Sequence, residues 1–380
     1  MTDQLDLFAD IRPYHDDEVP SCLARLRADQ ELQQALSKWL LPRVHGQLPG
    51  LSQWLIRQGL AWKFRKVENV AQFQAIMAKP LERVLRKSTQ GLSVSGLEQL
   101  DPKQAYLFVS NHRDIVMDPA LVNWSLYHQG LQTVRIAIGD NLLSRPYASD
   151  LMRLNKSFIV KRSVSGMREK LKAAKQLSLY IHHCIVNEQA NVWIAQREGR
   201  AKDGYDRTNP AVIGMFSLSC PKDRNYADYI NELNIVPVSI SYEQNPCDLQ
   251  HAKELLAKAK DERYLKSEGE DLRSIARGIT GDKGRVHLAF GRPVKGDFSS
   301  DAEVAAAIDQ QVQENLRLYP VNHWALAKLQ GQAAQAEDRA SQQLSERIQK
   351  MPDDLGQMLL LQYANAVQMK SGLPALTGQE

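Results

Sequence analysis

Seven short apolar runs alternate with helical stretches between residues 91 and 293, and this alternation constrains the fold more than any other feature of the chain. The runs are Leu92–Val94, Tyr106–Val109, Val134–Ile138, Phe158–Val160, Val192–Ala195, Ile235–Ser241 and Val286–Phe290. Short β-type segments separated by helical segments are typical of a sheet covered by helices. The sequence therefore predicts an α/β fold with a mixed sheet flanked by helices.

Helical sequence lies on both sides of this region. From about residue 20 to residue 87, leucine and tryptophan recur at helical spacing, and Val304 to Leu316 repeats an apolar residue every fourth position. We therefore expect helical extensions at both ends of the α/β region. The predicted domains are a helical N-terminal subdomain at 1–88, an α/β catalytic domain at 89–296 and a helical C-terminal extension at 297–380.

Charge and cysteine content exclude several functional classes. The 380 residues include 48 Lys and Arg against 44 Asp and Glu, a formal charge of +4 that is too mild to indicate nucleic-acid binding but suits anionic lipids or phosphates. The four cysteines form no Cys-x-x-Cys pair, so they predict neither a zinc site nor a redox motif. Because residues 1–10 are acidic and no apolar run approaches the roughly 20 residues of a membrane span, we expect a cytoplasmic protein with at most peripheral contact on the inner face of the cell membrane.

The segment Tyr106–Pro119 carries the strongest functional signal. An apolar strand runs directly into Asn-His-Arg-Asp at residues 111–114, and a helical pattern containing Asp118 follows. Active sites are often built at such a junction, because the free N–H groups at the start of the helix attract negative charge. Histidine, whose unperturbed imidazole has a pKa near ~6.5, can accept a proton from an alcohol when a carboxylate fixes its tautomer. His112 is therefore a candidate general base.

Two aspartates compete for the role of carboxylate partner. Asp114 and Asp118 both lie within reach of His112 along the chain, and the spacing alone does not choose between them. A plainer interpretation is that His112 caps the helix while Asp114 occupies its first turn, which is ordinary chemistry for a helix N-terminus.

The same segment resembles the first motif of the glycerolipid acyltransferase family, which is Asn-His followed by four residues and Asp. Asn111 and His112 fit this motif, although five residues separate His112 from Asp118. The resemblance implies His112 as the general base with Asp118 as its first candidate partner and Asp114 as its second. It also implies direct transfer from a thioester, without an acyl-enzyme, a metal or a cofactor.

Three further segments follow in the order of the family's motifs. A strand-like run ends at Lys161 and Arg162, Glu198-Gly199 follows a second run, and a third run, at 235–240, contains Pro237. Basic side chains in these places suit a phosphate, because an Arg fork binds two phosphate oxygens and Lys acts as a point charge. The resemblance assigns these residues to binding of the substrate phosphate: Arg113, Lys161, Arg162, Glu198, Gly199, Arg200 and Lys202.

Each of these segments also has a plainer interpretation. Lys161 and Arg162 suit a solvated strand end, and 196–202 suits a charged surface turn. The run at 235–240 reads as a buried strand, in which Pro237 predicts a strand start or a sheet edge because proline lacks a backbone donor. Trp54 to Lys66 mixes aromatic and basic residues as an interfacial helix does, or as a helix packed on the core with an exposed basic face does.

Together the motifs imply a bacterial O-acyltransferase of phospholipid biosynthesis. Its donor would be acyl-CoA or acyl-carrier protein, and its acceptor glycerol-3-phosphate or 1-acyl-glycerol-3-phosphate. The alternatives are a protein of the same fold that binds a lipid or an acyl carrier without turnover, and an acyltransferase for another hydroxylated lipid.

Overall fold

The computed structural model describes residues 6–143, 145–260, 264, 267 and 269–377. Packing divides them into two compact units, one within 1–81 and 135–176 and the other within 82–134 and 177–380. Residues 135–176 group with the N-terminal helices, so the units cut across the three predicted domain ranges. Those ranges, 1–88, 89–296 and 297–380, stay predictions about domains.

All seven expected strands are present, and each boundary lies within one residue of its predicted position. The second unit contains β1 (Leu92–Ser95), β2 (Leu107–Ser110), β5 (Val192–Ala195), β6 (Ile235–Tyr242) and β7 (Val286–Phe290). The first unit contains β3 (Arg135–Gly139) and β4 (Ser157–Val160).

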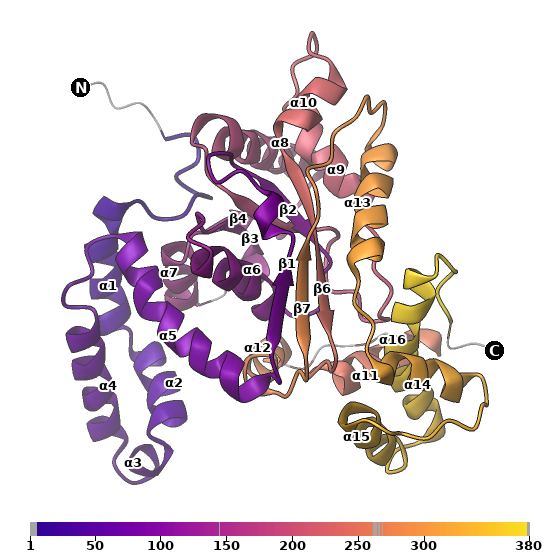
Figure 1. Ribbon diagram of the computed structural model, residues 1–380. Helices are drawn as coiled ribbons and strands as arrows, with labels where there is room; N and C mark the ends of the chain where they lie inside the picture. The colour runs from indigo at the N-terminus through magenta and orange to yellow at the C-terminus, as the bar shows by residue number, and fades with distance from the viewer. Residues whose placement is uncertain (1–5, 144, 261–263, 265–266, 268, 378–380) are drawn as a thin grey trace. The chain divides into compact units, whose positions relative to one another are not determined.

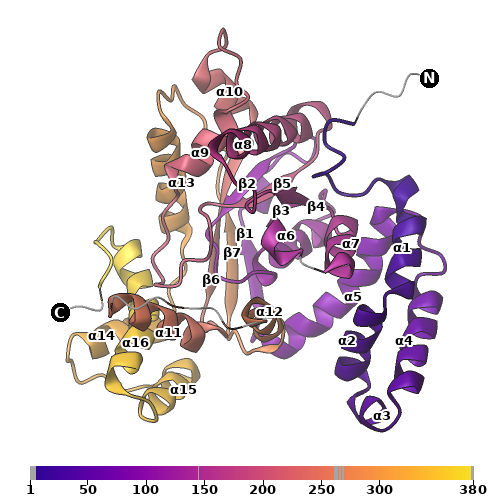
Figure 2. The same cartoon turned by 180° about the vertical axis from the view of Figure 1, so that it is seen from behind.

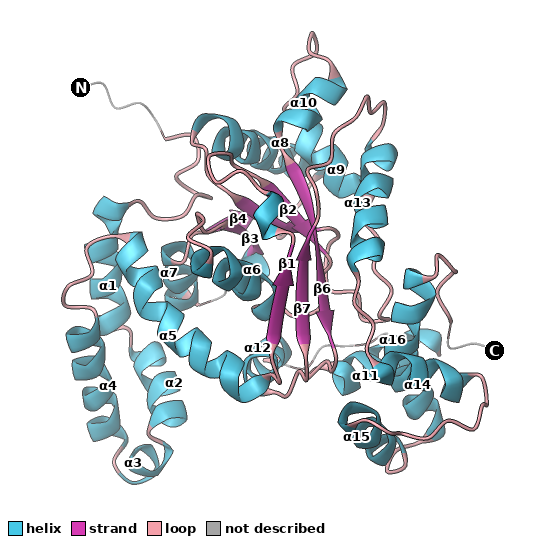
Figure 3. Cartoon of the chain, viewed as in Figure 1, coloured by secondary structure: helices cyan, strands magenta, loops and turns pink. Residues whose placement is uncertain are grey.

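The strands of the second unit form a mixed arrangement in the order β1-β7-β6-β2-β5. β2 is parallel to both of its neighbours, whereas β6 and β7 are antiparallel. Figure 3 shows β1, β7 and β6 side by side. Every residue of β2 and β7 is buried, as expected for strands covered on both faces. The predicted α/β class with a mixed sheet is confirmed.

Helices surround these strands. They are α6 (Met117–His128), α9 (Pro210–Ser217), α10 (Tyr226–Glu232), α11 (Asp248–Ala259), α12 (Glu270–Thr280), α13 (Asp301–Asn315), α14 (Pro320–Leu329), α15 (Arg339–Ile348) and α16 (Asp353–Lys370). In Figure 2, α11 lies with α14, α15 and α16, and these helices share an apolar cluster that includes Trp324, Leu344 and Leu359. The C-terminal helices therefore have a core of their own within this unit.

The first unit is mainly helical. Its helices are α1 (Val19–Ala28), α2 (Gln30–Leu40), α3 (Pro42–Gln47), α4 (Pro49–Lys63), α7 (Pro146–Leu154) and the beginnings of α5 (Val70–Ser88) and α8 (Met167–His182). Figure 1 shows the short α3 between α2 and α4. Asp29 caps α2 by accepting the N–H of Leu32 at 2.8 Å, which satisfies one free donor of the first turn. Within the described residues, no helix has both the length and the apolar character needed to cross a membrane.

β6 extends beyond its neighbour β2, and this difference positions the site described below. Ser110 at the end of β2 pairs with Val238, whereas β6 continues to Tyr242. Pro237 lies inside β6 rather than at a strand start or a sheet edge, so that expectation was wrong. The paired register with β7 begins at the next residue, Val238, which keeps the missing donor of Pro237 outside it.

Candidate active site

Asn111 fixes the loop after β2 against β6. Its Oδ1 accepts the N–H of Ile240 at 2.8 Å, and its Nδ2 donates to the carbonyl of the same residue at 3.0 Å. Nδ2 also donates to the carboxylate of Asp206 at 3.0 Å. Because the carboxamide is fully buried, these bonds satisfy groups that water does not reach. Asn111 thus continues the pairing with β6 past the end of β2 and sets where His112 begins.

His112 and Asp118 form a hydrogen-bonded pair at the end of β2. Nδ1 of His112 lies 2.8 Å from Oδ2 of Asp118, which stands in the first turn of α6. The same oxygen accepts the backbone N–H groups of Arg113 at 2.6 Å and Asp114 at 2.9 Å. An ionised carboxylate only accepts, so the network assigns the proton of a neutral imidazole to Nδ1 and leaves Nε2 as an acceptor. The rings of His112 and Trp193 lie edge to face with their centroids 5.9 Å apart.

The Asp114 carboxylate is bonded to the turn that leads into α6. Its Oδ1 accepts the N–H groups of Val116 at 3.0 Å and Met117 at 2.9 Å, the last residue before α6 and its first residue. Burial, together with the charge of Asp118, raises the pKa of Asp114. Gly278 of α12 lies against this carboxylate, and a Cβ atom there would approach Oδ2 to 2.0 Å. Of the two candidate partners, Asp118 is therefore the one bonded to His112, and Asp114 orders the start of α6.

Arg113 ties the His112 loop to residues 201–206. Its guanidinium donates to the carboxylate of Asp206 at 2.6 Å and to the carbonyls of Gly204 and Ala201 at 3.0 and 3.2 Å. The N–H of Ala201 in turn donates to the carbonyl of His112 at 3.0 Å. Asp206 is buried, and burial raises its pKa although Arg113 opposes the shift. The predicted phosphate-binding side chain of Arg113 therefore also has a structural role.

The predicted third motif follows β5 in the same unit. Gly199 has φ +74°, and a Cβ atom there would meet no other atom within 4 Å, so the backbone conformation rather than crowding favours glycine between Glu198 and Arg200. Lys202 forms an ion pair with Glu254 of α11. Burial lowers the pKa of Lys202.

A buried histidine from α11 lies near the basic residues of both motifs. His251 is 2% exposed, and its pKa is held well below the usual range. Burial is the main cause, and the remaining causes are electrostatic, from Arg200, Lys202, Arg113 and His112. These four groups therefore share one neighbourhood, although two of them follow β2 and two follow β5.

Lys161 and Arg162 follow β4 and belong to the first unit. The Lys161 ammonium forms an ion pair with Asp10 and donates to Oε1 of Gln176 at 3.1 Å. The backbone N–H of Arg162 donates to Asp140 at 3.1 Å, and its side chain is exposed. The structure thus brings the first and third motifs together within one unit and places the second motif in the other.

Sequence reasoning missed three polar residues at the site: Tyr242, Asp206 and His251. The hydroxyl of Tyr242 donates to Oδ1 of Asp118 at 2.7 Å. Burial and the charges of Asp118 and Asp114 raise the pKa of Tyr242 well above its usual value, so the hydroxyl stays a neutral donor. The only signal in the sequence was a polar aromatic residue at the end of an apolar run, which is common in strands.

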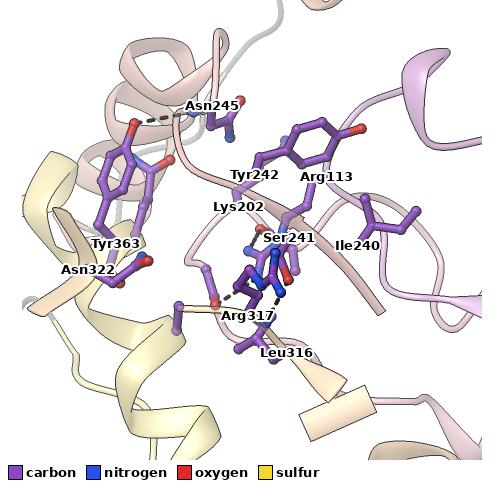
Figure 4. A pocket seen from close by; sticks show the side chains of 14 residues that line it. Arg113, Lys202, Ile240, Ser241, Tyr242, Asn245, Leu316, Arg317, Asn322 and Tyr363 are labelled. Carbon is purple, nitrogen blue, oxygen red and sulfur yellow. Dashed lines mark hydrogen bonds between the residues drawn. The ribbon is translucent and has the colours of Figure 1, made fainter. Parts of the chain in front are cut away.

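A cavity of about 50 Å³ lies beside these residues. Figure 4 shows Arg113, Lys202 and Arg317 around it, with Tyr242 of β6 and Tyr363 of α16. This volume holds a water molecule or two rather than an acyl chain. Among the side chains that the structure describes, no group of three or more His, Cys, Asp or Glu is placed to hold a metal ion.

Comparison with known proteins identifies a protein family to which this chain is similar. The family model described as Acyltransferase matches residues 91–241, which contain the first three motifs and most of β6. This match and the curated relatives below connect the chain with glycerolipid acyltransferases.

Two glycerol-3-phosphate acyltransferases are similar in sequence. The one from Pseudoalteromonas translucida is 27% identical over 60% of this chain and 27% of its own length. The one from Alteromonas mediterranea is 26% identical over 56% of this chain and 25% of its own length. The aligned part thus spans about a quarter of these relatives.

A solved structure also aligns with this chain, with 16% identity and a TM-score of 0.36. It is the 1-acyl-sn-glycerophosphate acyltransferase PlsC from Thermotoga maritima, and the alignment covers 75% of this chain and 94% of the other.

Proposed function

Because the chain carries an acyltransferase domain of the glycerolipid acyltransferase family, we propose that it transfers a fatty acyl group from a thioester to a hydroxyl of a phosphate-bearing glycerolipid precursor. The donor is acyl-CoA or acyl-carrier protein, and the acceptor is glycerol-3-phosphate or 1-acyl-glycerol-3-phosphate. The observation that carries this proposal is the His112–Asp118 hydrogen bond at the end of β2, which leaves Nε2 of His112 as a proton acceptor.

The proposed reaction proceeds by direct transfer. Nε2 of His112 takes the proton of the acceptor hydroxyl while its oxygen attacks the thioester carbonyl. Asp118 stabilises the imidazolium that forms, as the carboxylate of a catalytic triad does. When the tetrahedral intermediate collapses, the carbon–sulfur bond breaks and the thiolate receives the proton. The ester and the free thiol are the products, and the acyl donor is a co-substrate rather than a cofactor.

The positive groups near His251 support an acceptor that carries a phosphate. Arg113, Arg200 and Lys202 act on the same buried imidazole as His112 does, so an anion near them would also lie near the general base. Charge-assisted bonds from Arg and Lys are the usual means of holding a phosphate. Lys161 and Arg162 of the first unit are proposed as further phosphate contacts on the family resemblance alone, and Glu198 and Gly199 as the turn that presents Arg200.

A second element of the proposal is peripheral contact with the cytoplasmic face of the cell membrane. Large apolar side chains of the first unit, each 40–68% exposed, form what we call the α2–α4 surface: Trp39, Leu40, Leu48, Leu51, Trp54, Leu55 and Trp62. Tryptophan and leucine on a helix are typical of segments that lie in the membrane interface. Residues 30–66 hold six Lys or Arg and one Asp or Glu. This charge favours an anionic bilayer and opposes a second copy of the same surface.

The experiment that tests the enzymatic proposal compares wild type with His112→Ala. Purified protein is incubated with acyl-CoA or acyl-carrier protein and with glycerol-3-phosphate, 1-acyl-glycerol-3-phosphate or a monoacylglycerol that lacks phosphate, and the lipid products are measured by mass spectrometry. We expect product from the wild type with a phosphate-bearing acceptor, and a loss of about 10²- to 10⁴-fold in His112→Ala because the general base is gone.

His128→Ala is the matched control, since it removes an exposed histidine from the end of α6, the helix that carries Asp118. Equal rates in wild type and His112→Ala would exclude the general-base role. Binding of acyl donor without product from any acceptor would favour a lipid- or carrier-binding protein, and product from the monoacylglycerol alone would favour another hydroxylated lipid.

A further inference from the structure

The carboxylate of Asp118 is held by four donors, and one of them lies outside the residues that the motifs indicate. His112 Nδ1 and the backbone N–H groups of Arg113 and Asp114 all converge on Oδ2. Oδ1 accepts the hydroxyl of Tyr242 at 2.7 Å. The carboxylate is fully buried, so each oxygen depends on protein donors rather than on water. The orientation of the carboxylate plane therefore depends on Tyr242 as well as on the loop.

β6 brings Tyr242 to this position because it continues past the end of β2. The pairing of Asn111 with Ile240 lays the loop alongside the last residues of β6. Alternate residues of a strand point to the same face, so Tyr242 projects on the same side as Ile240. On its other edge, Tyr242 is in register with Val286 of β7, which fixes the backbone of this last residue of β6. The hydroxyl is thus presented by the sheet rather than by a loop.

We propose that Tyr242 is a positioning residue for the reaction: its hydroxyl orients the Asp118 carboxylate, which in turn keeps His112 in the Nδ1–H tautomer. This inference rests on the proposed function, in which Nε2 of His112 accepts the proton. Tyr242 is half-buried, and its hydroxyl donates to a carboxylate that itself only accepts, so in the proposed reaction Tyr242 orients Asp118 and transfers no proton. Without it, Oδ1 has lost its hydroxyl donor, and the carboxylate can rotate toward other partners.

Tyr242→Phe removes this one hydroxyl and keeps the ring. We expect kcat to fall about tenfold with KM for both substrates unchanged, because one hydrogen bond to a charged group is lost away from the substrates. The second readout is ¹⁵N NMR of protein labelled at its histidines, with the His112 signals assigned by their loss in His112→Ala. The wild type should show the Nδ1–H tautomer, and Tyr242→Phe should show a mixture of tautomers.

Tyr226→Phe is the matched control. The Tyr226 hydroxyl donates to Asp301 at 2.5 Å, so the variant also removes a tyrosine–aspartate hydrogen bond, but one between α10 and the start of α13. We expect this variant to retain wild-type kcat and the wild-type spectrum of His112. A general loss of stability would affect both variants, whereas a positioning role affects Tyr242→Phe alone.

The outcomes separate this inference from the proposed function. An unchanged kcat and an unchanged His112 tautomer in folded Tyr242→Phe would overturn the positioning role. Equal losses in Tyr242→Phe and Tyr226→Phe would overturn it too. If the wild type makes no acylated product but Tyr242→Phe still changes the tautomer, the acyltransferase proposal falls, and what stands is that Tyr242 orients Asp118 and sets the tautomer of His112.

Discussion

The His112 site in the second unit and the α2–α4 surface in the first unit place polar and apolar groups in opposite ways. At the site, Asn111, Asp114 and Asp118 are polar yet buried, and each is satisfied by named protein donors or acceptors. On the α2–α4 surface, Trp39 and Trp54 are large and apolar yet more than half exposed. Both placements cost free energy in a folded protein unless something compensates for them.

The difference between the regions is where the compensation comes from. Internal hydrogen bonds compensate for the buried carboxylates and the carboxamide, so the site is specified by the fold. For the exposed tryptophans and leucines, the compensation would come from the proposed contact with an anionic bilayer, which the excess of basic residues favours. Substitution at the site should therefore change chemistry and folding, whereas substitution on the surface should change only association.

The largest effect is expected from Asp118→Asn compared with Asp114→Asn. Asparagine at 118 removes the charge that stabilises the imidazolium and permits the other tautomer, so we expect kcat to fall by about 10³- to 10⁴-fold, as when a triad aspartate is lost. Asparagine at 114 keeps an oxygen that can accept the N–H groups of Val116 and Met117, so it should lower kcat much less. Steady-state acyl transfer measures both. Equal losses would show that the observed pairing of Asp118 with His112 does not set the roles of the two aspartates.

The next effect is a pH dependence of stability that comes from a buried lysine. Lys283 is fully buried, its ammonium donates to Ser88 Oγ and the Gly281 carbonyl at 3.0 Å each, and burial lowers its pKa from 10.5 to about 8. Between these two values the unfolded chain binds a proton that the folded chain does not, so stability rises with pH in this window. Over the whole window, this titration of Lys283 changes the free energy of unfolding by about 3 kcal/mol.

Urea unfolding at several values between pH 8 and pH 10.5 tests this, with wild type compared with Lys283→Met. Other groups titrate in the same window, but they do so in both proteins. We expect the free energy of unfolding of the wild type to increase relative to that of Lys283→Met as the pH rises. A difference that stays constant across the window would mean that Lys283 is not desolvated in the folded protein.

The smallest effect is expected from Trp54→Ser on membrane association. Loss of one large apolar side chain should weaken binding to phosphatidylglycerol vesicles by about tenfold, because burial of such a side chain contributes roughly 1.5–3 kcal/mol. Acyl transfer to a soluble acceptor should be unaffected. Vesicle flotation measures the binding, with phosphatidylcholine vesicles to test the role of charge.

Met167→Ser is the control for this variant, since Met167 is 85% exposed at the start of α8, outside the α2–α4 surface. Equal losses in the two variants would indicate a general hydrophobic effect. Equal binding of wild type to both kinds of vesicle would remove the argument from charge.

Several features followed from local sequence. The strands were predicted within one residue because short apolar runs bounded by polar residues leave little freedom in where a strand begins and ends. The junction of β2 with α6 was predicted because Asn111, His112 and Asp118 stand where a buried strand ends and a helix starts. The choice of Asp118 rested on the family motif, and the structure shows that carboxylate bonded to His112.

Other features depended on contacts between distant segments. Tyr242 and Asp118 are 124 positions apart in the chain. They meet because β6 continues to Tyr242 beyond the point where its neighbour β2 ends. His251 lies near the basic residues of two motifs because Lys202 is paired with Glu254 of the same helix, α11, and Arg113 is bonded to the loop after β5. The position of Pro237 inside β6 was missed because proline is tolerated there only if pairing with β7 begins one residue later, at Val238. That starting point is set by the sheet and not by the residues around Pro237.

The sequence by itself therefore determined the strands, the helical extensions and the His112 motif, because each depends on residues within one or two turns of helix or one strand. Only the tertiary structure decided that Tyr242 and His251 join the site and that residues 135–176 pack with the N-terminal helices. Hydrogen bonds and burial between segments far apart in the chain depend on strand order and register, which no local pattern of residues specifies.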